Sequence, residues 1–260
     1  MSDYNEMELM LSVASRQLED NSVVIVGTGA PCAAAMLAQK TWAPHMTILF
    51  EAGGTGPELT RMPISVGDSR TFYRGLWATS MDNIMSMLQR GEVDAAFIGG
   101  AQIDMYGNIN STVIGDHSAP KVRFPGSGGA NDLASLCWRS ICMTIHSPKR
   151  FVDKIDFVTT PGFLNGPVSR EKAGLPPDTG PSRVVTNLCV MGFHPDSKRM
   201  MVHTLHPGVT RNEVQENTGF ELIWSDDINE TPPPTDIELE LLREQIDPEK
   251  LIIGREVQLR

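Results

Sequence analysis

The sequence predicts an α/β protein with an open, mostly parallel, doubly wound sheet, helices on both of its faces and added antiparallel strands in the second half. Three observations predict this fold. Uninterrupted apolar runs such as Val23–Val26 are typical of strands buried on both faces, as parallel sheets require. Segments with helical spacing alternate with these runs in the first part of the chain. Glycines follow the runs directly, as they do where a sheet binds a ligand at its strand ends.

Helices and strands alternate through the first half of the chain. Each expected helix carries apolar residues at helical spacing, and the third begins at the N-cap Ser80 and stops at Gly91. Each expected strand is a short apolar run, and a glycine-rich, proline-bearing loop follows the second of them. The expected helices span residues 6–19, 32–38 and 81–90, and the expected strands span residues 23–26, 47–50 and 95–98.

The second half of the chain is richer in strand-forming residues. We expect turns at Tyr106–Asn108 and His194–Ser197, and a single domain over residues 1–260 in which 231–260 form a Pro-rich spacer and a short capped helix. This half predicts strands layered on the α/β core, at residues 109–114, 138–145, 155–159, 183–192 and 200–205.

Composition excludes several classes of protein. With 260 residues, 40% hydrophobic and 21% charged, the chain can bury a sizeable core and is not expected to be disordered. A net charge of -10 repels phosphate backbones and anionic lipids, so neither nucleic acid nor a membrane is an expected partner. The sequence has no apolar run of membrane-spanning length, and its start lacks the features of a secretory signal, which predicts a cytoplasmic protein.

The four cysteines predict buried free thiols. They lack CxxC or Cys/His ligand spacing and lie inside apolar segments, which suits a reducing compartment and indicates neither disulfides nor structural zinc. The six histidines are scattered without a readable Ser-His-Asp order, so we expect them to be structural or exposed.

Glu51 is the most informative residue. It follows four apolar strand residues, which places its carboxylate at the C-terminal edge of a parallel sheet, where open α/β folds bind ligands. The glycines after it are expected to let a substrate approach the backbone. The alternative is a strand-end charge that only faces water.

Two glycine-rich turns are further candidates. Gly27-Thr28-Gly29, followed farther along by the acidic Glu51, is similar to a dinucleotide-binding fingerprint. The match is defective, because Pro31 lacks the backbone N–H that a pyrophosphate would bind and Cys32 occupies the position of the third glycine. A tight strand-to-helix turn remains the structural alternative. Gly126–Asp132 offers backbone N–H groups for an anion or oxyanion, yet it lacks the Lys of a phosphate-binding loop, and many such strings are simply tight loops.

Taken together, these elements resemble the class I CoA-transferases, and within them the B (beta) subunits of glutaconate CoA-transferases. The likeness runs in order along most of the chain and is therefore more specific than any single motif. The segments that carry it are Val24–Gly29, Phe50–Gly53, Ser65–Asp68, Phe97–Asp104, Tyr106–Ser111, Arg123–Phe124, Gly126–Asn131, Lys154–Thr159 and Glu216–Phe220.

The resemblance implies a transferase of sulfur-containing groups in which Glu51 is the catalytic nucleophile. The family's strand-end motif usually has a polar residue after the glutamate, and Ala52 departs from it here. The implied chemistry is ping-pong through a glutamyl-CoA thioester on Glu51, with a CoA thioester as substrate and neither a bound cofactor nor a metal. The residues that would line the CoA and oxyanion region are Gly27, Thr28, Gly29, Ala30, Pro31, Gly100, Asn108, Gly128 and Gly129.

The resemblance also implies a partner. Class I CoA-transferases build one catalytic unit from two homologous subunits or halves, so a homologous A (alpha) subunit would complete a heterodimer or a larger hetero-oligomer. A small, glutaconate-like (di)carboxylic acid would be the CoA acceptor. Two alternatives stay open: a CoA-thioester decarboxylase or ring-opening hydrolase subunit on the same scaffold, and a non-catalytic scaffold subunit. Retention of Glu51 favours the transferase.

Overall fold

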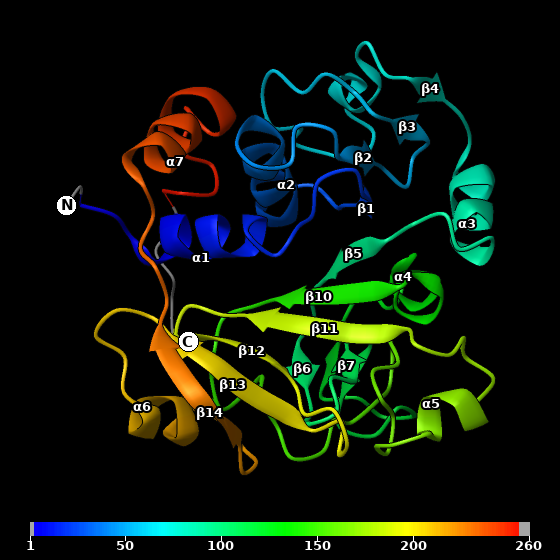
Figure 1. The fold of residues 1–260 in the computed structure, drawn as a ribbon. Helices are drawn as coiled ribbons and strands as arrows, with labels where there is room; N and C mark the ends of the chain where they lie inside the picture. The colour runs from blue at the N-terminus through cyan, green and yellow to red at the C-terminus, as the bar shows by residue number, and fades with distance from the viewer. Residues whose placement is uncertain (1–2, 255–260) are drawn as a thin grey trace. The chain divides into compact units, whose positions relative to one another are not determined.

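The computed structural model describes residues 3–254 and divides into two compact units (Figure 1). Of the described residues, the first unit comprises residues 3–97 and 233–254, and the second comprises Ile98–Pro232. The single domain over residues 1–260 stays a prediction. Residues 255–260 of its expected C-terminal segment lie outside the described residues.

The first unit contains a sheet whose centre is parallel, as predicted. Val24 and Ile25 of the central strand are fully buried, which explains the uninterrupted apolar run. The central strand has a parallel neighbour on each side, and two short antiparallel strands extend one edge. In spatial order the strands are β5 (Ala95–Ile98), β1 (Val23–Ile25), β2 (Thr47–Leu49), β3 (Gly54–Thr55) and β4 (Trp77–Ala78).

The helices of the first unit form where the sequence predicts them. At the start of the chain, Asn5 and Glu8 form a capping box, each side chain accepting the other's backbone N–H at 2.9 Å. The small-residue helix begins after the N-cap Gly29 and buries Cys32–Ala38 completely. The elements are α1 (Glu6–Ser15), α2 (Ala30–Lys40), the 3₁₀ turn η1 (Ser69–Phe72) and α3 (Met81–Gln89).

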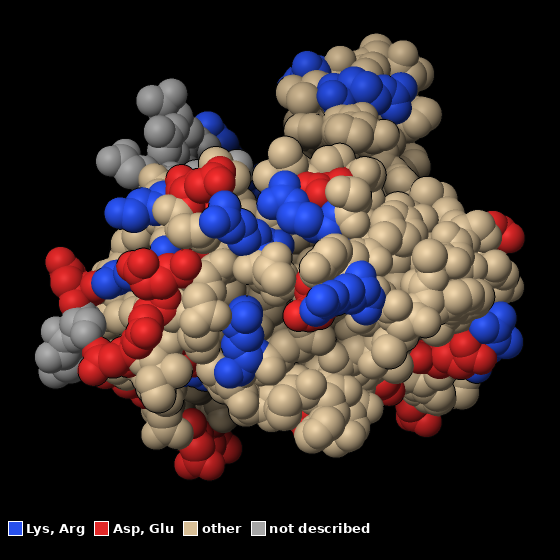
Figure 2. All heavy atoms as spheres, turned by 90° about the horizontal axis from the view of Figure 1, so that it is seen from above, with Lys and Arg blue, Asp and Glu red and all other residues tan. Residues whose placement is uncertain are grey.

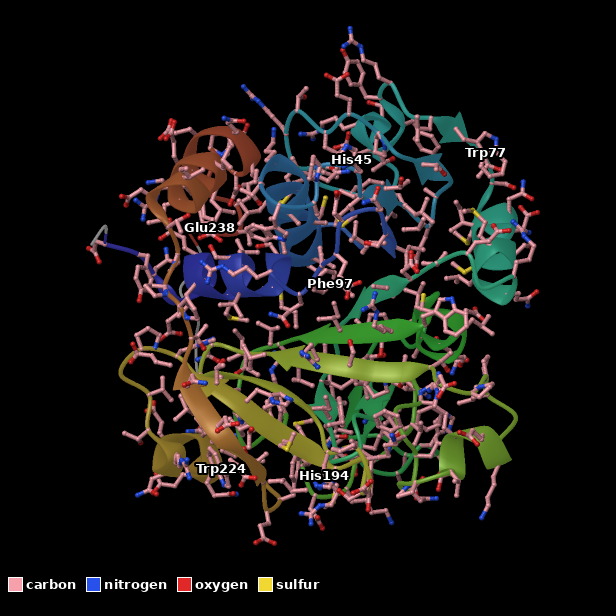
Figure 3. The ribbon with its side chains drawn as sticks, in the orientation of Figure 1. His45, Trp77, Phe97, His194, Trp224 and Glu238 are labelled. Carbon is pink, nitrogen blue, oxygen red and sulfur yellow. The ribbon has the colours of Figure 1, made fainter. Side chains whose placement is uncertain are left out.

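A C-terminal helix returns to the first unit. It consists of α7 (Asp236–Glu240), which starts at a capping box of Thr235 and Glu238 and continues as a π-helical turn, η2 (Leu241–Ile246). Glu238, which is labelled in Figure 3, has a buried carboxylate that accepts two hydrogen bonds from the Arg16 guanidinium, at 2.9 and 2.6 Å. Such bidentate geometry fixes position as well as adding energy, so it holds α7 against the end of α1.

The second unit has a mixed sheet with the antiparallel strands that the sequence predicts. Its spatial order is β14 (Ile223–Glu230), β13 (Met200–Leu205), β12 (Cys189–Phe193), β11 (Gly180–Val185) and β10 (Arg139–Met143). Two small hairpin sheets pair β6 (Gln102–Ile103) with β7 (Ile109–Asn110) and β8 (Val113–Ile114) with β9 (Val122–Arg123). The helices are α4 (Ala130–Leu136), α5 (Ser169–Lys172) and α6 (Arg211–Glu216).

Three expectations for the second half are corrected. Residues 183–192 form a hairpin rather than one strand, because the Thr186 hydroxyl accepts the N–H groups of Leu188 and Cys189 and turns the chain. Residues 155–159 form no strand, since backbone groups there bond to side chains, as Asp156 N–H does to Gln102 Oε1. Residues 109–114 form two strands of different sheets, β7 and β8, rather than one. In addition, β14 was not predicted, because the part of it from residue 225 to residue 230 is mostly polar and acidic.

The four cysteines are buried thiols that form no disulfide, as predicted. Burial raises the thiol pKa of Cys32, Cys142 and Cys189 to about 12, so they are protonated at neutral pH and shielded from reagents. We therefore expect a disulfide reagent such as DTNB to label the native protein slowly and all four thiols at once in guanidinium chloride. Rapid stoichiometric labelling under native conditions would show that these positions are accessible and contradict this expectation.

Candidate active site

Glu51 lies in a tight turn that connects β2 to β3. The Gly53 N–H donates to the Phe50 carbonyl at 2.9 Å, and the Phe50 N–H donates to the Gly54 carbonyl at 2.9 Å. Glu51 is thus the second residue of a four-residue turn and is half-buried. Because β2 runs parallel to β1, this carboxylate follows the C-terminal end of a parallel strand, as the sequence predicts.

The glycines that follow Glu51 have a different role from the one expected. The sequence predicts that they admit a substrate, but a Cβ on Gly53 would come within 1.8 Å of the Thr79 carbonyl oxygen. A Cβ on Gly54 would come within 1.9 Å of the Thr71 carbonyl oxygen. The chain's own backbone fills both spaces, so these glycines allow the β2–β3 turn to pack tightly and thereby fix the base of Glu51.

The turn Gly27–Pro31 lies at the same sheet edge as Glu51. The Val26 N–H donates to the Leu49 carbonyl at 3.1 Å, so the ends of β1 and β2 are level. The turn is a tight strand-to-helix connection in which Gly29, at φ +90°, is the N-cap of α2. The structure therefore brings together the two first-unit parts of the predicted site, Glu51 and the backbone N–H groups that begin α2.

The other predicted site residues belong to the second unit. Gly100 follows β5, and its carbonyl accepts a hydrogen bond from Arg150 Nη1 at 2.9 Å. A Cβ on Gly100 would come within 2.1 Å of Ile109 Cγ2. Packing against β7 is thus sufficient reason for glycine at this position, and contact with a ligand there stays a prediction.

Asn108 is buried and its side chain is fully occupied. Its Nδ2 donates to Asp104 Oδ2 and to the Leu164 carbonyl, both at 2.8 Å. Its Oδ1 accepts the N–H groups of Gly162 and Leu164 at 2.9 and 3.1 Å. These four bonds use the whole capacity of an amide, so Asn108 ties two loops together and can serve a site only by positioning them. Burial raises the pKa of Asp104, which completes this cluster.

The turn Gly126–Gly129 presents open backbone at the start of α4. Gly126 and Gly128 have φ values of +95° and +52°, and a Cβ on either would meet no atom within 4 Å. Gly129 is the N-cap of α4. The left-handed conformations explain the glycines, and the open space allows an anion to approach the N–H groups of the turn.

Two histidines, His146 and His206, are structural, in agreement with the expectation from the sequence. His146 is stacked on Phe151 and bonds through Nε2 to the Thr218 hydroxyl at 2.9 Å. His206 bonds to the Thr231 hydroxyl at 2.9 Å. Burial lowers their pKa values to about 3 and about 4, so both rings are neutral at physiological pH.

The segment of residues 64–81, which follows β3 and reaches the start of α3, carries several exposed apolar side chains. The sequence predicts only a glycine-rich loop in this region, whereas the structure forms η1 and the edge strand β4 there, with Trp77 on β4 labelled in Figure 3. Leu76 is 80% exposed, which is costly for a large aliphatic residue in water. We call this surface the 64–81 patch; its exposed members are Ile64, Val66, Tyr73, Leu76, Trp77 and Met81.

The face seen in Figure 2 has a broad area to the right of its centre with few charged side chains. Among residues 3–254, no three or more His, Cys, Asp or Glu residues are grouped so that they could hold a metal ion. No helix within these residues has the length and apolar character needed to cross a membrane.

Comparisons with known proteins agree with the resemblance inferred from the sequence. A family profile described as Coenzyme A transferase matches residues 8–217. The chain is 40% identical over 250 residues to the B (beta) subunit of the 3-oxoadipate CoA-transferase of Pseudomonas knackmussii, a match that covers 94% of each chain. It is 40% identical over 258 residues to the B (beta) subunit of the glutaconate CoA-transferase of Acidaminococcus fermentans, covering 97% of this chain and 96% of that one.

The solved structures confirm the fold. The crystal structure of glutaconate coenzyme A-transferase from Acidaminococcus fermentans aligns with a TM-score of 0.92 and 38% identity, covering 98% of this chain and 99% of that one. A more distant relative, the cholesterol ring-cleaving hydrolase IpdB subunit of Rhodococcus jostii, is 33% identical over 59% of this chain and 60% of its own. With the profile match over most of its length, the chain belongs to the coenzyme A transferase family, a family of enzymes.

Proposed function

We propose that this chain is the nucleophile-bearing subunit of an enzyme that moves CoA between an acyl-CoA and a small dicarboxylic acid. The observation that carries the proposal is the placement of Glu51. Its carboxylate stands in a tightly packed turn at a parallel-strand end, level with the glycine turn that begins α2. A half-buried position gives the carboxylate access to a substrate while part of its surroundings is dry.

The proposed chemistry is a ping-pong exchange. The Glu51 carboxylate attacks the thioester carbonyl and expels CoA thiolate, which leaves an acyl-glutamyl anhydride. The thiolate then attacks the glutamyl carbonyl, releasing the first acid as a carboxylate and leaving CoA on Glu51 as a thioester. The incoming acid attacks that thioester, and the same two steps in reverse deliver the new acyl-CoA.

Every step of this exchange passes through a tetrahedral oxyanion. Backbone N–H groups stabilise such charge best when they are fixed before the reaction and shielded from water. The backbone of Gly27–Ala30, at the same sheet edge as Glu51, supplies such groups, and in the second unit the open Gly128 and the N-cap Gly129 supply others. We assign the CoA and oxyanion region to these turns and to Gly100, with Asn108 holding its loop in place.

The relatives guide the choice of acid. The two relatives that are 40% identical are named for 3-oxoadipate and glutaconate, both dicarboxylic acids. We therefore propose a dicarboxylate of this kind as the acceptor. The hydrolase-like alternative rests on a relative that matches only 59% of the chain, and it predicts net thioester loss instead of exchange.

We also propose a homologous A subunit as the partner. The relatives are named as B subunits, which implies a second chain, and the exposed 64–81 patch is the kind of surface that a partner covers. The patch leads back to the active-site turn, because β4 pairs with β3 and the Thr79 N–H donates to the Gly53 carbonyl at 3.0 Å. A cytoplasmic location stays a prediction.

Assembly with the A subunit should depend on this patch. We expect Leu76→Asp to weaken association by about 10-fold or more, because a carboxylate would be desolvated where an apolar side chain fits. Ile237→Asp, at a 66% exposed apolar residue on α7 outside the patch, is the matched control. Co-purification and sedimentation of the two subunits measure the effect, and equal association of both variants would contradict the role of the patch.

Trapping the covalent intermediate tests the proposed function. The assembled enzyme, incubated with an acyl-CoA and no acceptor acid, should retain CoA on a peptide spanning residues 47–61, as located by mass spectrometry. Adding glutaconate or 3-oxoadipate should release that CoA as a new acyl-CoA. An adduct on a different peptide, or release of free CoA without exchange, would overturn the proposal.

A further inference from the structure

Helix α4 carries the Gly126–Gly129 turn at its N-terminal end, and both ends of this helix are held by polar side chains. A turn with two left-handed glycines has many accessible conformations and does not keep one shape by itself. The geometry of its N–H groups therefore depends on what anchors the turn and the helix that follows. The anchors all lie within the second unit.

The N-terminal end of α4 is held by Asn131. Its Nδ2 donates to the Thr159 carbonyl at 2.9 Å, and its backbone N–H donates to Ser127 Oγ at 3.0 Å. Ser111 holds the start of the turn, because its carbonyl accepts the Gly126 N–H and its hydroxyl donates to the Gly126 carbonyl, both at 3.0 Å. The Ser111 N–H also donates to Thr159 Oγ1 at 2.9 Å, so the two supports are joined.

The C-terminal end of α4 is held by Arg170. Its Nη2 donates to the carbonyls of Ala134 and Ser135 at 2.6 and 3.2 Å, which are last-turn carbonyls of the helix. The remaining donors bond to the carbonyls of Pro161 and Gly162 and to the Thr179 hydroxyl. Arg170 is only 4% exposed, and burial lowers the pKa of its guanidinium to about 10.

Arg170 also links α4 to the Asn108 cluster. Gly162, whose carbonyl accepts from Arg170 Nη1 at 3.1 Å, donates its own N–H to Asn108 Oδ1. Burying a cation costs free energy unless its N–H donors are hydrogen-bonded. Here the Arg170 donors bond mainly to backbone carbonyls and so hold those backbone segments together. A lysine has three donors on a flexible stem and cannot bridge the same set of carbonyls.

We propose that Asn131 and Arg170 are positioning residues for CoA transfer, which fix α4 at both ends and so preset the Gly126–Gly129 turn. The inference rests on the proposed function, in which this turn supplies N–H groups to an oxyanion of the exchange. Donors that are already in place cost nothing to reorganise during the reaction. A displacement of about 1 Å can lower the rate on the order of 100-fold.

The test compares Asn131→Ala, Arg170→Lys and the control Lys172→Met in the enzyme assembled with its A subunit. Asn131 and Lys172 are exposed, and Lys172 lies on α5 beside Arg170, so neither change removes core packing. We expect Asn131→Ala and Arg170→Lys to lower kcat and kcat/KM equally, by about 10- to 100-fold, because only transition-state binding is lost. KM should stay within about two-fold, and Lys172→Met should leave both constants unchanged.

Three further measurements separate positioning from folding and from the proposed function. The rate at which CoA is trapped on Glu51 should fall in both variants while the final amount of adduct stays the same. If kcat stays within about two-fold of the unsubstituted enzyme, or falls only in proportion to the loss of folded, assembled protein, the positioning role is overturned. If Glu51→Gln retains CoA exchange, the proposed function itself has failed, whatever the Asn131 and Arg170 variants show.

Discussion

Glu51→Gln should abolish CoA exchange while leaving the fold and the assembly of the subunits nearly unchanged. Glutamine has almost the same shape as glutamate, but its amide cannot form the anhydride and thioester of the proposed path. The turn that carries residue 51 is held by backbone bonds between Phe50, Gly53 and Gly54, which the substitution does not touch. We expect a loss of at least about 10⁴-fold in kcat, measured by transfer of CoA from an acyl-CoA to glutaconate.

Glu51→Asp should show how closely the carboxylate must be placed. The shorter side chain withdraws the nucleophile by about one methylene, and a displacement of ~1 Å can cost on the order of 100-fold in rate. The matched control is Glu58→Gln, which removes an exposed carboxylate from the same region of the first unit, where it pairs with Arg74 at 3.0 Å. A surface ion pair of this kind contributes little, so its loss should not affect exchange.

These variants also separate the competing functions. Robust exchange in Glu51→Gln would show that the nucleophile is another residue or that this chain is a scaffold. Persistent hydrolysis or decarboxylation without exchange in the unsubstituted enzyme would instead favour the same-fold alternatives. A fall in melting temperature that tracks the loss of exchange would mean that residue 51 acts through stability.

The parallel centre of the first unit could be predicted because its signal is local. Val23–Val26 is apolar at every position since the strand is buried on both faces, and the expected strand at 95–98 matches β5 residue for residue. The position of Glu51 followed from the same run of strand residues. By contrast, β3 and β4 are two-residue strands formed by a chain reversal, and no periodicity marks such short elements.

The sequence predicted which residues belong to the candidate site better than it predicted what each of them does. The sequence marked Gly53, Gly100 and Asn108 as site residues or neighbours, but only the structure shows which atoms surround them. Their surroundings are backbone and loops distant in sequence, such as Leu164 bonded to Asn108. Arg170 gave no signal at all, because a single arginine in a loop-rich segment is indistinguishable from a surface charge until its carbonyl partners are known.

A large effect on stability is also expected from substitution of Gly54, because any side chain at this position would clash with the backbone. Gly54→Ala would place a Cβ within 1.9 Å of the Thr71 carbonyl oxygen, so β3 or η1 has to move. We expect a destabilisation of about 3 kcal/mol or more, together with loss of activity, because the displaced turn carries Glu51. Gly67→Ala is the control, since a Cβ there meets no atom within 4 Å.

Urea denaturation of the two glycine variants measures the difference. Gly67→Ala should change the free energy of unfolding by no more than about 1 kcal/mol, since the added methyl lies in open space and the unfolded chain loses some freedom. Equal stability of the two variants would mean that the β2–β3 turn yields to an added methyl without cost. In that case the tight packing after Glu51 could not be what holds the nucleophile in place.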